Sequence, residues 1–149
     1  MLKALKSLLG ETSAKPAAAQ RRQLHVAVAS LLHEATRVDL NEAEVERTAA
    51  EMALADLFGL GLDECATVLA EGRAKAQQLT SYFGPVSIIK RELGQPERMR
   101  LIEHLWRIAH ADGPLDPYED HYVRKIGHLL YVTNTDIIIA RNRARGAMS

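Results

Sequence analysis

Four acidic residues of this sequence repeat one spacing. Asp39 is followed seven residues later by Glu46, and Asp112 is followed seven residues later by Glu119. Each aspartate is expected in the last turn of a helix, where the helix dipole disfavours an anion by about 0.3–1 kcal/mol unless a donor or a cation compensates it. Carboxylate oxygens suit hard cations such as Ca²⁺ and Mg²⁺. If the two segments pack together, the four carboxylates form a candidate divalent-cation site.

A capped turn explains most of the second segment without any ligand. Asp116 is placed to cap a helix, Pro117 stands at its first position and Glu119 at its third, which is the capping-box pattern. Gly113 fits a left-handed helix end. The turn leaves Asp112 unexplained, because that carboxylate opposes the dipole of its own helix. A structural turn and a cation site therefore both stay open, with the turn as the simpler of the two.

Two further residues near this turn are candidate ligands. His110 precedes Asp112 by two residues and would add a nitrogen to the oxygens, and Asp116 would add another carboxylate. This mixture admits Mn²⁺ or Zn²⁺ beside Ca²⁺ and Mg²⁺. The spacing is not that of an EF-hand, which has glycine at its sixth and glutamate at its twelfth position. No histidine pair has the i, i+4 spacing of a helical zinc site, so separate histidines are the simpler interpretation.

The elements that position these residues are all predicted to be helices. Apolar residues recur at helical spacing, and no segment alternates with period two for long enough to form a strand. We expect a compact all-α bundle of seven or eight short helices. They are predicted within residues 2–9, 16–37, 41–61, 62–79, 81–93, 95–113, 116–132 and 134–145. The first is expected to pack on the domain or to fray, with a weak surface anchor as the alternative.

Several helix boundaries and one buried face can be predicted from single residues. Thr12 or Ser13 is expected to cap the helix entered near Pro16, and Asp63 to cap a later one. Asn134 or Thr135 is expected to cap the last helix. In the segment 41–61, helical spacing predicts a shared buried face made of Val45, Ala49, Met52, Ala53 and Leu57.

The two aspartate–glutamate pairs belong to two segments of similar pattern, which suggests an internal repeat. One copy covers about residues 20–60, the other about 96–146, and helices at about 62–94 stand between them within a single domain of residues 1–149. Pairing Glu46 with Glu119 aligns the buried positions of the two copies, which are Ala50, Ala53 and Leu57 in the first and Val123, Ile126 and Leu130 in the second. Pairing Glu44 with Glu119 would bury Glu51, so we reject that register. We expect two helix–Asp-turn–helix hairpins about an approximate twofold axis.

At these residues the chain resembles a known family. The paired units, with "HADGPLDPYE" and "IGHLLYV" in the second, resemble the TerB-like family, named for a tellurite-resistance protein, over about residues 20–145. The first copy departs from the pattern, with Leu40 where glycine is usual. The resemblance implies an all-helical domain like the one at the amino end of a membrane-bound DnaJ-type co-chaperone. It also implies metal chelation by the acidic turn residues, and it implies no catalytic activity.

Composition narrows the function further. The 149 residues contain 19 basic and 19 acidic side chains, so no net field attracts nucleic acid, and no apolar run reaches the length of a membrane span. A single cysteine, Cys65, excludes an internal disulfide and fits a reducing cytoplasm. We expect a cytoplasmic binding or scaffold module of a tellurite-type stress response, with protein partners that it could meet at the inner membrane surface.

The sequence gives less support to an enzymatic function. The chain has no Gly-x-Ser-x-Gly motif and no glycine-rich phosphate loop. Cys65 is expected near a helix amino terminus, which would lower the pKa of its thiol, although a packing role is the simpler interpretation. A metal-dependent hydrolase that uses the same acidic cluster is the alternative function.

Overall fold

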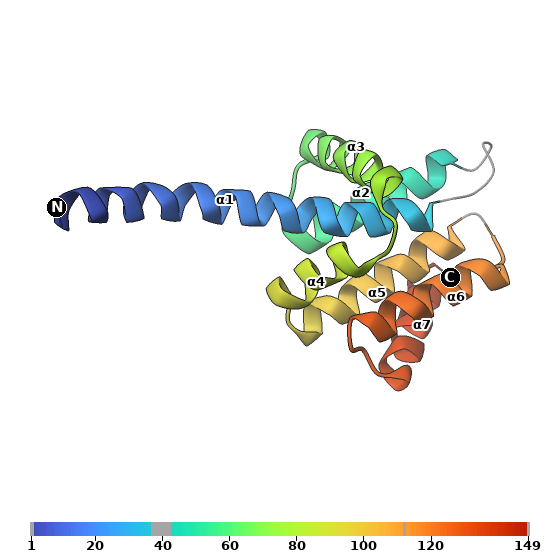
Figure 1. The fold of residues 1–149 in the computed structure, drawn as a ribbon. Helices are drawn as coiled ribbons and strands as arrows, with labels where there is room; N and C mark the ends of the chain where they lie inside the picture. Colours follow the sequence, from blue (N-terminus) through green and yellow to red (C-terminus); the bar gives the residue numbers. More distant parts are fainter. Residues whose placement is uncertain (1, 37–42, 112, 149) are drawn as a thin grey trace.

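The chain is all-helical in the part that the structure describes. The computed structural model describes residues 2–36, 43–111 and 113–148, and the side chains of 17–36, 44–111 and 113–146. These residues form seven α-helices and no strand, which confirms the predicted fold class (Figure 1). The helices are α1 (Leu2–Ala35), α2 (Ala43–Phe58), α3 (Leu62–Gln78), α4 (Phe83–Glu92), α5 (Gln95–His110), α6 (Pro117–Leu129) and α7 (Asn134–Met148). None of the described helices is both long and apolar enough to cross a membrane.

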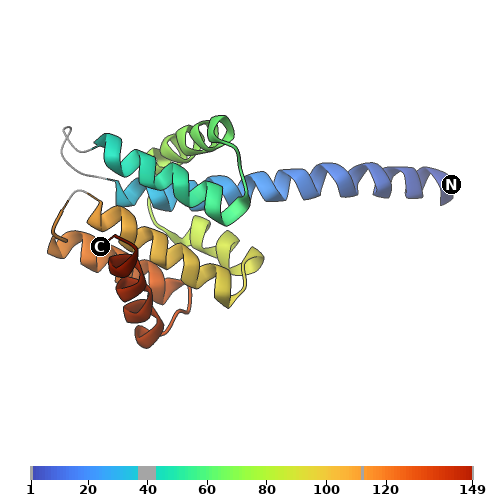
Figure 2. The ribbon, with the colours of Figure 1, turned by 180° about the vertical axis from the view of Figure 1, so that it is seen from behind.

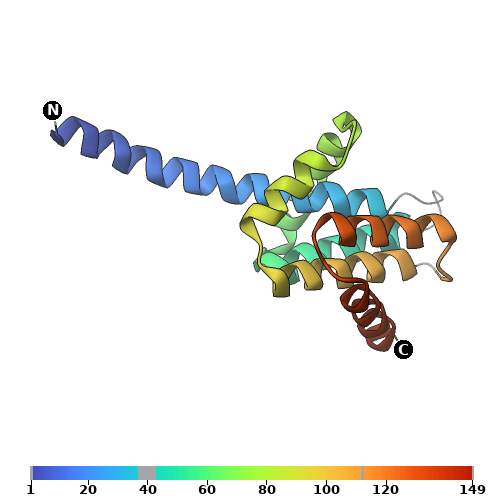
Figure 3. The same ribbon diagram turned by 60° about the horizontal axis from the view of Figure 1, so that its bottom comes forward.

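Helix α1 is longer than the sequence predicts. It runs without a break from Leu2 to Ala35, and its amino-terminal part extends beyond the other helices (Figures 1 and 3). The predicted separate helix at 2–9 and the cap at Thr12 or Ser13 are therefore wrong. Pro16 has no amide hydrogen and removes one backbone hydrogen bond, but the alanines that follow it are the strongest helix formers. The local propensity outweighs the missing bond.

The core lies between two layers of helices. Helix α1 packs mainly against α3 and α4, helix α5 packs mainly against α7, and α2 joins the layers by packing on α5 and α3 (Figures 1 and 2). Polar atoms of buried aromatic side chains bond to backbone carbonyls across this core. The indole N–H of Trp106 donates to the carbonyl of Ile137 at 3.1 Å, and the Tyr122 hydroxyl donates to the carbonyl of Leu31 at 2.7 Å. These bonds fix α5 to α7 and α6 to α1.

The buried face of α2 differs from the predicted one. Val45 is 53% exposed and Met52 is 64% exposed, so their assignment to the core is wrong. Ala50, Ala53 and Leu54 are fully buried instead, and Glu46 continues this buried face at the start of the helix. Apolar spacing alone gave two possible faces here, and the structure buries the one that contains a carboxylate.

The aligned positions of the two hairpins are similarly buried. Ala50 and Ala53 are fully buried and Leu57 is half-buried in the first copy. The matching residues of the second copy, Val123, Ile126 and Leu130, are all fully buried. This burial agrees with the predicted register, whereas the internal repeat itself stays a prediction.

Two predicted helix caps are shifted. Helix α3 has Gly61 at its cap position without a side-chain bond, and Asp63 lies in the first turn, so the predicted Asp63 cap is wrong. At α7 the hydroxyl of Thr133 accepts a hydrogen bond from the backbone amide of Asp136 at 3.2 Å. Thr133 therefore caps this helix, one residue before the predicted position.

Candidate functional site

Four helix ends meet at one end of the bundle, which we call the hairpin end. The carboxy-terminal ends of α1 and α5 and the amino-terminal ends of α2 and α6 lie there (Figures 1 and 3). A pocket of about 30 Å³ joins three of them, with Glu34 and Ala35 from α1, Ala109 from α5 and Glu119 from α6 in its lining. Two of the predicted ligands, Asp39 and Asp112, lie outside the described residues.

Glu46 is the buried carboxylate of this region. Its side chain is fully buried in the first turn of α2, and no other described aspartate or glutamate is buried to that degree. Moving an ionised carboxylate out of water is costly unless hydrogen-bond donors or an opposite charge face it. A carboxylate in this position is therefore a residue that the protein must compensate.

The position of Glu46 along the bundle follows from the contact between α2 and α5. The two helices run antiparallel (Figures 1 and 2), and Asp56 Oδ2 lies 2.7 Å from His104 Nε2. Glu46 precedes Asp56 by ten residues, which is about 15 Å of helix. Helix α5 ends at His110, only six residues or about 9 Å beyond His104. Glu46 therefore lies about one turn beyond the carboxy-terminal end of α5, at the hairpin end.

The second turn has the cap that the sequence predicts. The Asp116 side chain accepts a hydrogen bond from the backbone amide of Glu119 at 2.8 Å, and Pro117 begins α6. Glu119 is half-buried and lines the small pocket together with Glu34. Capping thus accounts for Asp116, and it places the Glu119 side chain on the inner side of the hairpin end.

His110 presents one ring nitrogen that the described residues leave without a hydrogen bond. Its Nδ1 lies 2.8 Å from the carbonyl oxygen of Trp106, and a carbonyl can only accept, so Nδ1 carries the hydrogen. Nε2 then has a lone pair, and it is buried without a hydrogen-bond partner among the described residues. Histidines that bind metals usually donate their other N–H to a carbonyl or carboxylate in this way.

The described residues do not complete a metal site by themselves. Among them, no group of three or more histidine, cysteine, aspartate or glutamate side chains is arranged to hold a metal ion. The structure brings Glu46 and Glu119 to the hairpin end together with His110. The predicted site also needs Asp39 and Asp112, which fall in the parts of the chain that are not described.

A second polar contact, between α2 and α5, was not recognised in the sequence. His104 donates Nε2–H to Asp56, and Arg100 forms an ion pair with the same carboxylate at 2.6 Å. Burial lowers the pKa of His104, so the ring is neutral near pH 7. The hydrogen bond from His104, and then that from Arg100, lower the pKa of Asp56. The i, i+4 spacing of Arg100 and His104 was the available signal, but it identifies no partner on another helix.

Cys65 has a structural role. Its side chain is fully buried, and its Sγ lies 3.7 Å from the carbonyl oxygen of Leu60. Burial raises the pKa of the thiol, so the expected lowering by the helix amino terminus is wrong. The preferred packing interpretation is confirmed.

The fold and the hairpin end define the class of protein: an all-helical bundle in which helical hairpins turn at one end beside a buried carboxylate. A comparison with protein families matches residues 25–142 to the family described as tellurite resistance protein TerB. The chain belongs to this family, which confirms the resemblance seen in the sequence. Comparisons with curated proteins and with solved structures gave no significant match.

Proposed function

We propose that this TerB-family protein is a non-enzymatic binding module that holds a divalent cation at the hairpin end. It acts through protein partners in a tellurite-type stress response in the cytoplasm. Membership of the TerB family supports the setting. The observation that carries the cation site is the complete burial of the Glu46 carboxylate beside the ends of the two hairpins. In this proposal the cation adds a positive charge beside the buried Glu46 carboxylate.

Three described side chains support such a cation. Glu46 and Glu119 provide oxygens from α2 and α6, and the buried Nε2 of His110 provides a nitrogen lone pair at the end of α5. Asp39 and Asp112 complete the proposed ligand set, with Asp116 as a further oxygen donor. Oxygen ligands alone favour Ca²⁺ or Mg²⁺, whereas the participation of His110 favours Mn²⁺ or Zn²⁺.

The size of the pocket favours binding over hydrolysis. A metal-dependent hydrolase needs an open coordination position and a cleft that admits its substrate. The pocket that the described residues line at the hairpin end measures about 30 Å³, which is room for about two water molecules. The hydrolase therefore stays the alternative function, without an observation in its favour.

Calorimetric titration of each cation into EDTA-treated protein tests the proposal. Wild type should bind at least one of Ca²⁺, Mg²⁺, Mn²⁺ and Zn²⁺, and Asp112→Asn should abolish the binding while it leaves the metal-free fold unchanged. Glu119→Gln keeps a side chain that suits the capping box, so its effect separates ligation from capping. If none of the four cations binds, the acidic residues of the second turn have only the structural role of a capped turn. Phosphoester turnover that is lost in Asp112→Asn would instead establish the hydrolase.

A further inference from the structure

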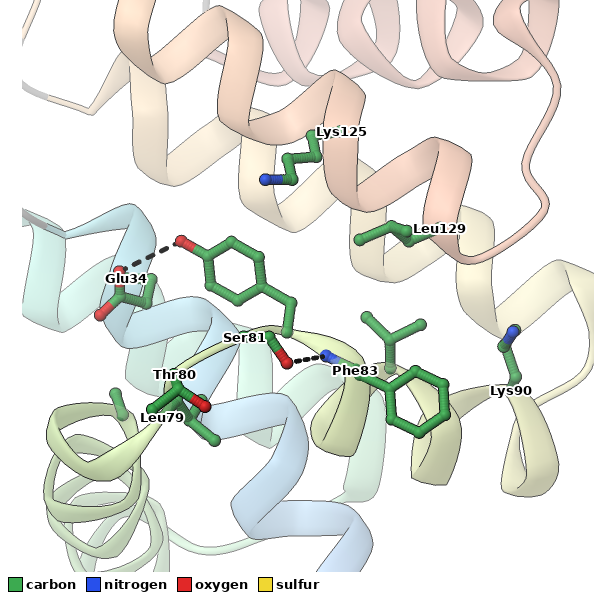
Figure 4. Close-up of a pocket in the computed structure, with 11 residues that line it drawn as sticks. Glu34, Leu79, Thr80, Ser81, Phe83, Lys90, Lys125 and Leu129 are labelled. Atoms are coloured by element: carbon green, nitrogen blue, oxygen red, sulfur yellow. Dashed lines mark hydrogen bonds between the residues drawn. The ribbon is translucent and has the colours of Figure 1, made fainter.

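A groove of about 600 Å³ lies between α4 and α6 (Figure 4). Its walls come from these two helices, and its ends come from α1, α3 and the connection at residues 79–82. A volume of this size is typical of ligand sites in proteins. The side chains that matter for recognition are Glu34, Phe83, Lys90, Lys125 and Leu129.

Two lysines give the groove its charge. Lys90 extends from α4 and Lys125 from α6, so that they lie on opposite walls (Figure 4). The Lys90 ammonium lies 4.4 Å from the ring centre of Tyr131, and that of Lys125 lies 5.4 Å from the ring centre of Tyr82. Neither forms an ion pair among the described residues, whereas several arginines do: Arg107 with Glu103 and Arg124 with Asp120. The groove therefore has two positive charges that no described carboxylate pairs with at ion-pair distance, and its one lining carboxylate, Glu34, lies at one end.

Exposed apolar side chains lie between the two lysines. Phe83 is 76% exposed and Leu129 is 38% exposed, and both line the groove. Tyr131 is 68% exposed beside Lys90. Aromatic side chains are enriched in protein–protein interfaces, and lysines attract acidic groups of a partner. Their position predicts an occupant with both apolar and acidic groups.

The backbone of Tyr131 provides an independent indication. Its φ angle is 59°, in the left-handed region, where the Schellman end of α6 would favour glycine. The bonds of that motif are present, from Val132 N–H to the carbonyl of Gly127 at 2.9 Å and from Tyr131 N–H to that of His128 at 3.0 Å. A bulky residue there costs about 1 kcal/mol, and this exposed ring regains little of it by burial. Because Tyr131 destabilises the fold in this conformation, we infer that its side chain has a role other than folding.

We propose that the groove binds an acidic amphipathic peptide segment of a partner protein. Apolar side chains of the segment cover Phe83 and Leu129, and its carboxylates pair with Lys90 and Lys125. A bilayer fits less well, because the surface is concave and Glu34 places a carboxylate at one end of it (Figure 4). This inference rests on the binding-module part of the proposed function and does not depend on the cation site.

Fluorescence anisotropy with three designed peptides tests the inference. The acidic probe is a labelled amphipathic helix of about 14 residues with leucine and phenylalanine on one face and glutamate on the other. One control replaces every glutamate by lysine, and the other replaces the apolar residues by serine. In EDTA buffer the acidic probe should bind at least tenfold more tightly than either control, and the binding should weaken as salt screens the charges.

Variants of the groove should change this preference. The double substitution K90E/K125E should weaken binding of the acidic probe at least tenfold and create binding of the lysine control. Phe83→Ser should weaken binding of the acidic probe about fivefold. Arg143→Glu on α7 and Met52→Ser on α2 alter exposed residues outside the groove and should leave binding unchanged. All of these side chains reach solvent, so circular dichroism should show an unchanged fold.

Three results would overturn the inference. They are no preference for the acidic probe, wild-type binding by K90E/K125E, and binding of phosphatidylserine vesicles that the same substitution abolishes, which would assign the groove to a membrane. Because the titrations contain EDTA, they give the same result whether or not the hairpin end binds a cation. A failure of the peptide test and a failure of the cation test are therefore distinguishable.

Discussion

The two hairpins place their glutamates at matching sequence positions but in different surroundings. Glu46 follows Asp39 by seven residues and is fully buried in α2, whereas Glu119 follows Asp112 by seven residues and is half-buried behind a capped turn. The second turn is stabilised locally, by the bond between Asp116 and the Glu119 amide. The first keeps the Glu46 carboxylate inside the bundle. The same spacing therefore places a half-buried glutamate behind a capped turn in one copy and a fully buried glutamate in the other.

The hairpins also differ in how closely a covering helix approaches them. A Cβ atom at Gly72 of α3 would lie 2.5 Å from Ala29 Cβ and 2.6 Å from the Ala29 backbone carbon of α1. At Gly127 of α6 the nearest atoms belong to the end of the Ile137 side chain, 2.6 Å and 2.8 Å away. The first hairpin is thus packed backbone against backbone, and the second against a side chain that can move.

Gly72→Ala should have the largest effect on stability. The added methyl group meets the α1 backbone, which cannot shift without separating the helices, so we expect a loss of about 3 kcal/mol. Gly127→Ala is the matched control and should cost about 1 kcal/mol, since Ile137 can adopt another rotamer. Denaturant midpoints of the two variants measure the difference. Equal losses would contradict the difference in packing between the hairpins.

Asp116→Ala should have an intermediate effect, confined to the second hairpin. It removes the acceptor for the Glu119 amide at the start of α6 and should cost about 1 kcal/mol in chemical denaturation. Asp116→Asn keeps an acceptor oxygen and should cost much less. If alanine and asparagine are equally stable, the cap does not hold this turn.

The hydrogen bond between His104 of α5 and Asp56 of α2 joins the two hairpins, and it should make stability depend weakly on pH. Since burial lowers the pKa of His104 in the fold, the unfolded chain binds protons more readily, and stability should fall as pH drops below about 6.5. His104→Gln keeps an N–H for Asp56 and should reduce this slope between about pH 6.5 and 5.5. Burial also lowers the pKa of His25, so His25 should keep part of this pH dependence in the variant. Denaturant midpoints across this range provide the measurement, and an unchanged slope would contradict the assignment.

Much of the fold can be predicted from the sequence because its signals are local. Helical periodicity, Pro117 and the Asp116 cap define α6 well, since neighbouring residues decide each of them. The choice between two apolar faces of α2 is not local. Burying Glu46 rather than Val45 depends on how α2 packs against α5 and α3, which the sequence of α2 does not encode.

The candidate site was predictable only in part. The spacing of carboxylates identified Glu46 and Glu119, and both lie at the hairpin end in the fold. The tautomer of His110 depends on the carbonyl of Trp106 and could not be predicted from residue type. The lysines of the groove, Lys90 and Lys125, stand 35 positions apart on different helices, so only the packing of α4 and α6 relates them.

A thermal melt with and without cation tests the central claim most directly. Wild type in EDTA should gain about 2.7 kcal/mol when one of Ca²⁺, Mg²⁺, Mn²⁺ or Zn²⁺ is present at a hundred times its dissociation constant, which raises the melting temperature by about 5–10 °C. Glu46→Gln should abolish the rise, whereas Glu44→Gln, an exposed residue in the same turn of α2, should keep it. No rise with any of the four cations at about millimolar concentration, or an equal rise in Glu46→Gln, would contradict a cation site at the hairpin end.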